Sequence, residues 1–107
     1  KTDANGLITS VADNKPKGIP TEFVLNQNYP NPFNPLTTIT YAMPVSGFAR
    51  LAVYNMLGQE VVTLVNENQG PGYKSVSFNA GGLPSGMYTY RITAGTFTDV
   101  KKMILMK

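Results

Sequence analysis

A proline-rich stretch constrains this chain more than any other feature of its sequence. Residues Asn28–Pro35 read Asn-Tyr-Pro-Asn-Pro-Phe-Asn-Pro. Each proline fixes its own φ angle, removes a backbone donor and disfavours the helical region for the residue before it. The stretch therefore predicts an extended or kinked segment, in which Tyr29 and Phe33 pin the chain to the folded unit that follows. The prolines with this structural role are Pro30, Pro32 and Pro35.

The composition differs on the two sides of this stretch. Residues 1–21 are rich in Lys, Asp, Asn, Gly, Pro and Ser and show no hydrophobic period, which predicts a flexible linker. Residues 22–107 are expected to form the folded unit. The chain has 107 residues, of which 42% are hydrophobic and 14% charged, so it has room for one globular domain.

Apolar and polar residues alternate with a period of two in most segments after the linker. In Thr37–Met43, for example, Ile39, Tyr41 and Met43 fall on one face. Such alternation of β-branched and aromatic residues is typical of half-buried strands, and no segment has a helical period. About seven strands, with turn signals every ~8–12 residues, predict an all-β fold, an immunoglobulin-like antiparallel β-sandwich of Greek-key type. The predicted strands are Glu22–Asn26, Thr37–Met43, Phe48–Tyr54, Glu60–Val65, Lys74–Phe78, Met87–Thr93 and Phe97–Met106.

Turn signals separate these strands. Asn55–Gly58 predicts a type I turn closed by a left-handed residue, a position that suits glycine because it has no Cβ. Asn66–Gly72 predicts a turn-rich loop, and Pro84–Gly86 predicts a tight turn. The glycines are expected to be conformational requirements, and the tyrosines beside them are expected to pack. The residues with such an expected structural role are Tyr54, Gly58, Gly86 and Tyr88.

The composition excludes several kinds of catalytic site. The chain has no His, Cys or Trp, so Ser-His-Asp and Cys-His catalysis and His- or thiolate-based metal sites are excluded. The lack of cysteine also excludes a disulfide framework and leaves the redox compartment open. The six carboxylates are well separated in sequence, so no paired-carboxylate site or calcium loop can be recognised. The sequence therefore predicts a domain that is not an enzyme and that binds no cofactor or metal.

The charge gives little indication of a nucleic-acid partner. The formal net charge is +3, and the cations are scattered instead of forming the concentrated basic stripe of nucleic-acid-binding proteins. No apolar run reaches transmembrane length, and the first residues lack the apolar core of a signal peptide. An export signal of the usual kind is therefore expected upstream, on a longer parent chain.

The aromatic residues leave a second class of function open. Carbohydrate-binding modules of the sandwich type stack sugars on exposed rings, and a glycan is therefore a second candidate partner. Most aromatic residues here fall on strand faces in alternation, where core packing accounts for them. A carbohydrate-binding module of a secreted glycoside hydrolase remains the alternative function. The aromatic residues that would form its platform are Tyr29, Phe33, Phe48, Tyr54 and Tyr73.

Four short motifs occur in a fixed order along the chain. The first two are Gln27–Pro35 and Val53–Val61. The third is Leu83–Tyr88, and the fourth is Lys102–Lys107. Each is weak alone, but together they resemble the motifs of type IX (Por) secretion system C-terminal sorting domains. The second motif also resembles the immunoglobulin-like domain of flagellar hook-capping proteins, which belong to another system.

The resemblance implies a small β-sandwich that directs a secreted parent protein of a Gram-negative bacterium. Its implied partners are the outer-membrane secretion machinery, which accepts folded cargo carrying the domain, and a surface sortase. The sortase would cut the linker and attach the cargo, so the parent would be secreted or held at the outer membrane and cell surface. The resemblance implies no catalytic residue in the domain itself.

The last strand is expected to carry the recognition residues. Phe97–Met106 ends in a run that is apolar on both faces and flanked by lysines. Such a strand could be added to a receptor sheet, or it could be a buried strand whose lysines protect an edge. An exposed edge could also pair two copies into a weak homodimer. The expected recognition residues are Lys102, Met103, Ile104, Leu105, Met106 and Lys107.

Overall fold

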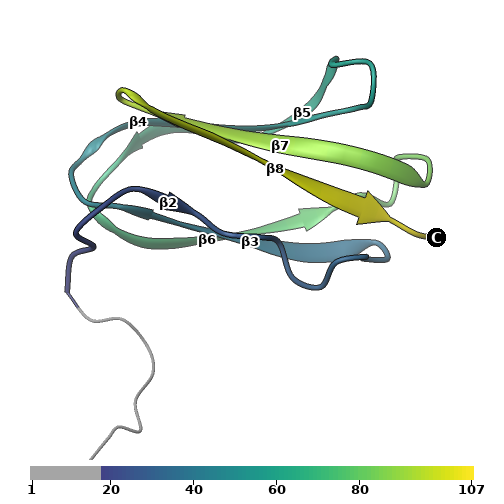
Figure 1. The fold of residues 1–107 in the computed structure, drawn as a ribbon, viewed down its shortest axis with the longest axis horizontal. Helices are drawn as coiled ribbons and strands as arrows, with labels where there is room; N and C mark the ends of the chain where they lie inside the picture. The colour runs from purple at the N-terminus through teal and green to yellow at the C-terminus, as the bar shows by residue number, and fades with distance from the viewer. Residues whose placement is uncertain (1–17) are drawn as a thin grey trace, which may run out of the picture.

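Seven β-strands and no helix make up the part of the chain that the structure describes (Figure 1). The structure is a computed structural model, and it describes residues 18–107. Most of the predicted linker, residues 1–17, lies outside the described residues, and Pro20 is already buried. No helix in the described range is long and apolar enough to cross a membrane. The strands are β2 (Val24–Leu25), β3 (Leu36–Met43), β4 (Gly47–Tyr54), β5 (Glu60–Gln69), β6 (Gly72–Asn79), β7 (Gly86–Ala94) and β8 (Phe97–Leu105).

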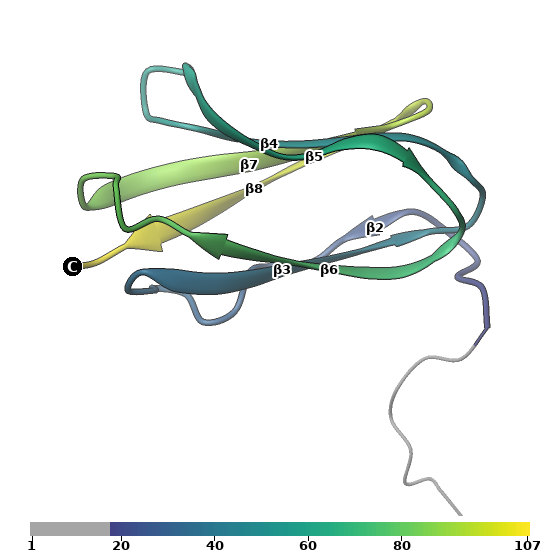
Figure 2. The ribbon, with the colours of Figure 1, turned by 180° about the vertical axis from the view of Figure 1, so that it is seen from behind.

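The strands form two antiparallel sheets that face each other (Figures 1 and 2). The three-stranded sheet has the order β2-β3-β6, and the four-stranded sheet has the order β5-β4-β7-β8. The consecutive strands β3 and β4 lie in different sheets, and each pairs with a strand from later in the chain. Greek-key connections produce such non-consecutive neighbours. The predicted all-β sandwich is confirmed.

Alternate residues of the strands point into the space between the sheets and form one core. In β3 these residues are Ile39, Tyr41 and Met43, as the alternation predicts, and none is more than 1% exposed. Strand β7 buries every second residue in the same way, whereas β8 buries Met103 and Leu105 and leaves the alternate residues before them half-buried. Burying a large apolar side chain contributes about 1.5–3 kcal/mol, so the alternation determines which face of each strand turns inward.

Two buried tyrosine hydroxyls link the sheets. Tyr90 in β7 donates a hydrogen bond of 2.6 Å to the backbone carbonyl of Asn26, just after β2. Tyr41 in β3 donates to the side-chain oxygen of Gln69 in β5. A buried hydroxyl without a partner is costly, so these bonds allow two large rings to enter the core. Burial is also the main reason why the pKa of Tyr90 is raised to about 12.

One predicted loop is mostly strand. Strand β5 continues to Gln69, so the prediction of a loop over Asn66–Gly72 is wrong except at its end. The neighbouring strand explains the difference, because Gly47 at the start of β4 lies opposite Gln69. Asn, Glu and Gln have low strand propensity, but pairing with an adjacent strand overrides it here.

The turn after β6 also differs in position from its prediction. The hydrogen-bonded turn spans Ala80 to Leu83, with the Leu83 N–H donating to the Ala80 carbonyl at 3.0 Å. The predicted tight turn at Pro84–Gly86 is therefore misplaced. The Ala80 N–H in turn donates to the carbonyl of Pro35 at 2.9 Å, which ties the start of this loop to the proline-rich stretch.

The proline-rich stretch forms a loop that doubles back on itself. The backbone N–H and C=O of Tyr29 both bond to Thr38, at 3.0 and 2.9 Å. Inside this loop, the buried Asn28 amide donates to the Thr37 hydroxyl at 3.0 Å and to the Pro30 carbonyl at 3.2 Å. The Thr37 hydroxyl itself donates to the Pro30 carbonyl at 2.9 Å. These bonds fix the two ends of the loop side by side.

The two aromatic rings of this stretch have opposite environments. Phe33 is 2% exposed and packs against Phe78, with ring centroids 6.0 Å apart. Tyr29 is 81% exposed. The prediction that both rings pin the chain to the sandwich is therefore wrong for Tyr29, which is held by its backbone alone.

We predict that Phe33→Ala lowers the free energy of unfolding by about 3–5 kcal/mol, because it leaves a cavity in the core. Tyr29→Ala, an aromatic deletion in the same loop, should change it by no more than about 0.5 kcal/mol. Urea unfolding of both variants, followed by circular dichroism, measures the difference. Equal losses of stability in the two variants would contradict the assignment of Phe33 as the anchoring ring.

We also predict a loss of stability in alkali that depends on Tyr90. Its pKa is about 12 in the folded chain and about 10 when unfolded, so the unfolded state loses its proton first. The free energy of unfolding should therefore be unaffected by this group below about pH 10 and fall between about pH 10 and 12. Tyr90→Phe is expected to be less stable at pH 8 but to show a shallower alkaline decline in urea titrations at several pH values. Parallel curves for the two proteins would contradict this.

Candidate functional site

The six expected recognition residues at the end of the chain are not equivalent. Met103 and Leu105 point into the core and are 0% and 1% exposed. The residues between and after them are exposed, with Ile104 at 39% and Met106 at 57%. The strand is therefore buried on one face only, although its sequence is apolar on both. The exposed members of the set are Lys102, Ile104, Met106 and Lys107.

The outer edge of β8 is closed by the proline-rich loop. Strand β8 is the last strand of its sheet, so one edge has no neighbouring strand among the described residues. Phe33 pairs with the end of this edge: its N–H donates to the Ile104 carbonyl at 3.0 Å, and its carbonyl accepts from the Met106 N–H at 2.9 Å. The Ile104 N–H donates to the Asn31 side-chain oxygen at 2.9 Å. The loop lies beside the end of β8 in Figure 1.

Further contacts continue this closure along β8. The Gln27 side-chain amide donates to the Lys102 carbonyl at 2.6 Å. The Val100 N–H is bonded to the side chain of its neighbour Asp99 at 2.8 Å. Near the start of β8, Phe97 stacks on Phe23, with ring centroids 5.2 Å apart. A receptor strand or a second copy would have to displace these groups to pair with the end of β8.

The chain end is tied to the loop between β6 and β7. The Lys107 N–H donates to the Ser85 hydroxyl at 3.1 Å, and its ammonium group donates to the Gly81 carbonyl at 2.9 Å. Tyr88, near the start of β7, donates to the Pro84 carbonyl at 2.6 Å in an arrangement similar to the tyrosine corner of immunoglobulin-like sandwiches. The loop between β6 and β7 is thus fixed at both ends and holds the terminus.

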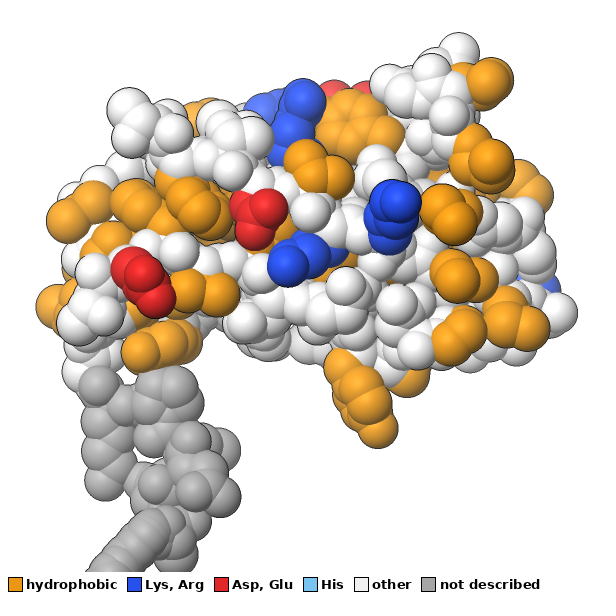
Figure 3. All heavy atoms as spheres, viewed as in Figure 1, with side chains coloured by type: hydrophobic (Ala, Val, Ile, Leu, Met, Phe, Trp, Pro, Cys, Tyr) orange, Lys and Arg blue, Asp and Glu red, His pale blue; other side chains and the backbone are white. Residues whose placement is uncertain are grey.

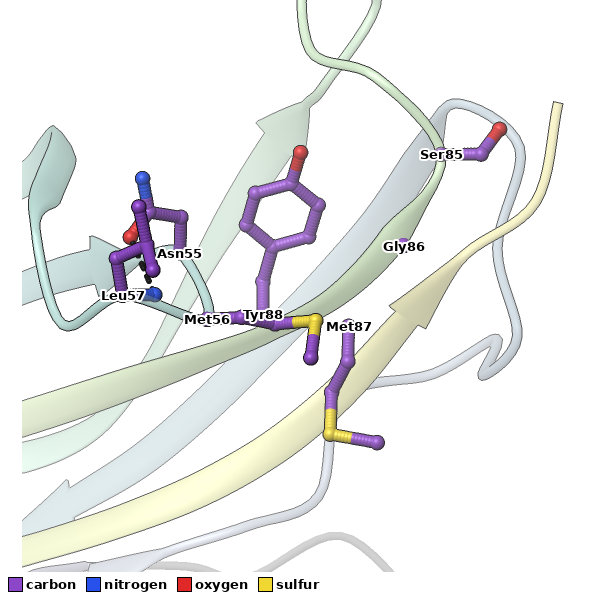
Figure 4. A pocket seen from close by; sticks show the side chains of 7 residues that line it. All are labelled: Asn55, Met56, Leu57, Ser85, Gly86, Met87 and Tyr88. Carbon is purple, nitrogen blue, oxygen red and sulfur yellow. Dashed lines mark hydrogen bonds between the residues drawn. The ribbon is translucent and has the colours of Figure 1, made fainter.

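The turn between β4 and β5 lies against the start of β7. The Asn55 side-chain oxygen accepts from the N–H groups of Leu57 and Gln59, at 2.9 and 3.0 Å. The turn closes with Gly58 at a φ angle of +82°, a left-handed conformation that suits glycine. Together the turn and β7 border a shallow groove (Figure 4). The groove is lined by Asn55, Met56, Leu57, Ser85, Gly86, Met87 and Tyr88.

The side chains around this groove point in different directions. Tyr88 is buried, and its ring points away from Met87 in Figure 4. Met87 is 41% exposed, and it lies on the same side as Met56, which is 78% exposed. The sequence-based reasoning missed both methionines. The alternation of β7 could have placed Met87 on the outer face, but nothing in the sequence indicates that Met56 lies beside it.

The groove continues into the outer face of the four-stranded sheet. Met87 lies directly opposite Ile104 on β8, and Thr89 lies opposite Lys102. On the other side of β7, Tyr54 lies opposite Thr89. Since directly opposite residues on one face of an antiparallel pair touch, the exposed residues of β8 and the groove form one surface.

The charged groups on this face are mostly cationic. The Arg91 guanidinium lies over the Tyr54 ring, 4.9 Å from its centroid, and donates to the Tyr54 hydroxyl at 2.8 Å. Glu60 accepts from Thr63 and Arg50, and these bonds hold the pKa of the Glu60 carboxyl below its usual value. The carboxylate therefore stays ionised and paired, which leaves Arg91 and Lys102 to give the face a positive charge.

Comparison with protein families supplies the assignment that the geometry alone does not. Residues 27–106 match the family described as the secretion system C-terminal sorting domain. The chain belongs to this family. It is thus a type IX secretion sorting domain, and the match covers all four motifs except the final Lys107. Comparison with curated proteins gives no match.

The geometry of the sorting domain does not favour the carbohydrate-binding alternative. Of the five aromatic residues expected to form a platform, Phe33 is in the core and Tyr54 is covered by Arg91. Phe48 points out from the four-stranded sheet and Tyr73 from the three-stranded sheet, so the two rings face opposite ways. Within residues 18–107 there is also no group of His, Cys, Asp or Glu side chains that could hold a metal ion.

We predict that Asn31→Ala in the sorting domain releases one edge amide of β8. The Ile104 N–H loses its acceptor, so its hydrogen exchange should accelerate about five- to tenfold, whereas the Met106 amide keeps its bond to Phe33. Residue-resolved exchange measured by NMR distinguishes the two amides. Asn34→Ala, at an exposed asparagine of the same loop, is the matched control, and an equal effect in both variants would contradict the closure of the edge.

Proposed function

We propose that the outer-membrane secretion machinery recognises the exposed side chains at the end of β8. Support comes from one observation: these side chains are exposed, with only the Lys107 ammonium bonded within residues 18–107, to the Gly81 carbonyl, while the backbone groups of Ile104 and Met106 are bonded to the proline-rich loop. Addition of a receptor strand requires unpaired N–H and C=O groups, whereas contact through side chains does not. The two buried residues of the set pack the strand into the core. The residues proposed for recognition are Lys102, Ile104, Met106 and Lys107.

We further infer that the parent protein reaches the cell surface and is cut from the domain there by a sortase. Membership of the sorting-domain family supports this, as does the polar, Gly- and Pro-containing composition of residues 1–21, which suits an accessible linker. The packed part of the chain includes Pro20, so a cut before this residue leaves the domain whole. The domain needs no catalytic group of its own for this role.

A reporter fusion tests the proposed function. A periplasmic reporter is joined to the start of residues 1–107 and expressed in a host with a type IX system. Surface exposure is then measured by adding protease to whole cells. The fusion should reach the surface in this host and remain in the periplasm of a strain that lacks the outer-membrane translocon. Removing the last five residues is not a clean test, because it also removes two core side chains, Met103 and Leu105.

Substitution of exposed residues separates recognition from folding. We predict that Met106→Ala combined with Lys107→Ala lowers the surface fraction of the reporter about tenfold or more, since removing one good contact of about 1.4 kcal/mol has that effect on binding. Its free energy of unfolding should change by no more than about 1 kcal/mol, because both side chains are exposed and the only side-chain hydrogen bond that they make within the described residues, from Lys107 to the Gly81 carbonyl, is itself exposed. Val45→Ala combined with Ser77→Ala changes two exposed positions, on the β3–β4 connection and on β6, and serves as the control. Export of both double variants at the same level would refute recognition at the end of β8.

A further inference from the structure

An apolar and basic surface lies on the outer face of the four-stranded sheet, continuous with the exposed residues of β8. We propose that this surface docks into an apolar groove with an acidic rim on a protein of the secretion machinery. Such docking presupposes the sorting function proposed above and specifies the chemistry of the partner. We call the surface the docking face. It consists of Met56, Leu57, Met87, Arg91, Lys102 and Ile104.

The apolar part of the docking face consists of four exposed side chains, from the β4–β5 turn, β7 and β8. Leu57 is 83% exposed and Met56 78%, so both project almost completely into solvent. Met87 and Ile104, which lie opposite each other on β7 and β8, are 41% and 39% exposed. In Figure 3, hydrophobic side chains are seen at both ends of the molecule, including the end where β8 ends. Contiguous exposed apolar side chains of this kind mark interaction sites more often than single ones do.

The turn itself does not require apolar residues at its tip. Its geometry is maintained by the Asn55 side chain, which accepts two backbone N–H groups, and by Gly58 at its left-handed position. The central positions of a type I turn accept most residue types, and polar ones are favoured there by their hydration. Met56 and Leu57 therefore contribute nothing to the turn that a polar residue would not. Their apolar side chains are explained by a contact outside the domain.

The charges of the docking face point to an acidic partner. Lys102 is exposed on β8, and Arg91 is exposed on β7 two residue pairs away along the ladder. The carboxylate of Glu60 is bonded to Arg50 and Thr63 and also interacts with Arg91 through its charge, so with three cations and one carboxylate the face keeps a net positive charge. Complementary charge at the rim of an interface steers association and determines orientation, while the apolar centre supplies affinity. Acidic side chains beside an apolar groove fit this pattern.

The shape of the docking face favours a protein over a lipid surface. The shallow groove between the turn and β7 is lined by Met56 and Met87, so an apolar side chain of a partner can pack against it. A bilayer surface does not fill such a groove. Methionine side chains are unbranched and adapt to the shape of a partner. Six residues are few compared with the 20–30 per side of a standard stable interface, which suits a contact that is released after transport.

Charged substitutions at the tip and on the sheet test the docking face. In the reporter fusion, Leu57→Asp and Lys102→Glu should each lower the surface fraction about tenfold or more, with unchanged resistance of the purified chain to urea. Val45→Asp and Ser75→Glu place acidic side chains at exposed positions on the β3–β4 connection and on β6, and they should be exported like the unmodified chain. Normal export of Leu57→Asp would overturn the proposal.

Photo-crosslinking identifies the class of partner. A benzophenone amino acid is placed at Leu57 in one fusion and at Val45 in another, and the cells are irradiated during export. An adduct with a protein of the secretion machinery from position 57 alone is the expected result. An adduct with phospholipid or lipopolysaccharide, or no adduct at position 57, would overturn it. Purified chain should likewise not bind phosphatidylglycerol vesicles, and binding that Leu57→Asp abolishes would favour the lipid instead.

The unmodified fusion distinguishes the two proposals. If it never reaches the surface of the competent host, the sorting function proposed for this chain fails. If it does reach the surface and the docking-face variants are exported equally well, only the docking-face proposal is wrong. If Met106→Ala with Lys107→Ala blocks export while Leu57→Asp does not, recognition is confined to the end of β8.

Discussion

The arrangement of the domain depends on Phe33, whose ring and backbone act in different places. The ring lies between the sheets against Phe78, and the backbone pairs with Ile104 and Met106 at the outer edge of β8. Strand β2 is only two residues long and belongs to the other sheet, so it cannot cover this edge. The proline-rich loop does so instead. One residue thereby joins the two sheets and protects the terminal strand from uncontrolled pairing.

Closure of the edge changes what the terminal strand can present to a partner. An open edge offers N–H and C=O groups that are the same in every protein, so pairing through it depends little on sequence. Asn31 and Phe33 occupy these groups at Ile104 and Met106, so the end of β8 presents its outward side chains to a partner, and these are specific to its sequence. Recognition by side chains suits a sorting signal, because the machinery must distinguish this domain from other folded β proteins.

Much of the fold was predictable from the sequence because it follows from local alternation. The period of two in β3 and β7 identified the strands and their buried faces. The pairing of Phe33 with the end of β8 was not predictable, because the residues are about 70 positions apart and no local pattern records the contact. The same limit explains why Tyr29 and Phe33 looked alike, and why Met56 and Met87 were not expected to meet. The prediction of a loop at Asn66–Gln69 was wrong for the opposite reason. Pairing with a neighbouring strand overrides the low strand propensity of these residues.

The motif around the β4–β5 turn combines residues that make a structure with residues that the structure displays. Gly58 is required by a φ angle of +82°, and Asn55 by the two N–H groups that it accepts. The geometry of the turn restricts which residues can occupy these positions, so the residue types found there give no information about a partner. Met56 and Leu57 are under no such constraint, and leaving them in water is unfavourable. A motif therefore gives information about binding at positions where the fold does not require an apolar residue and yet an apolar side chain is exposed. In this domain these positions lie beside the exposed residues of the last strand.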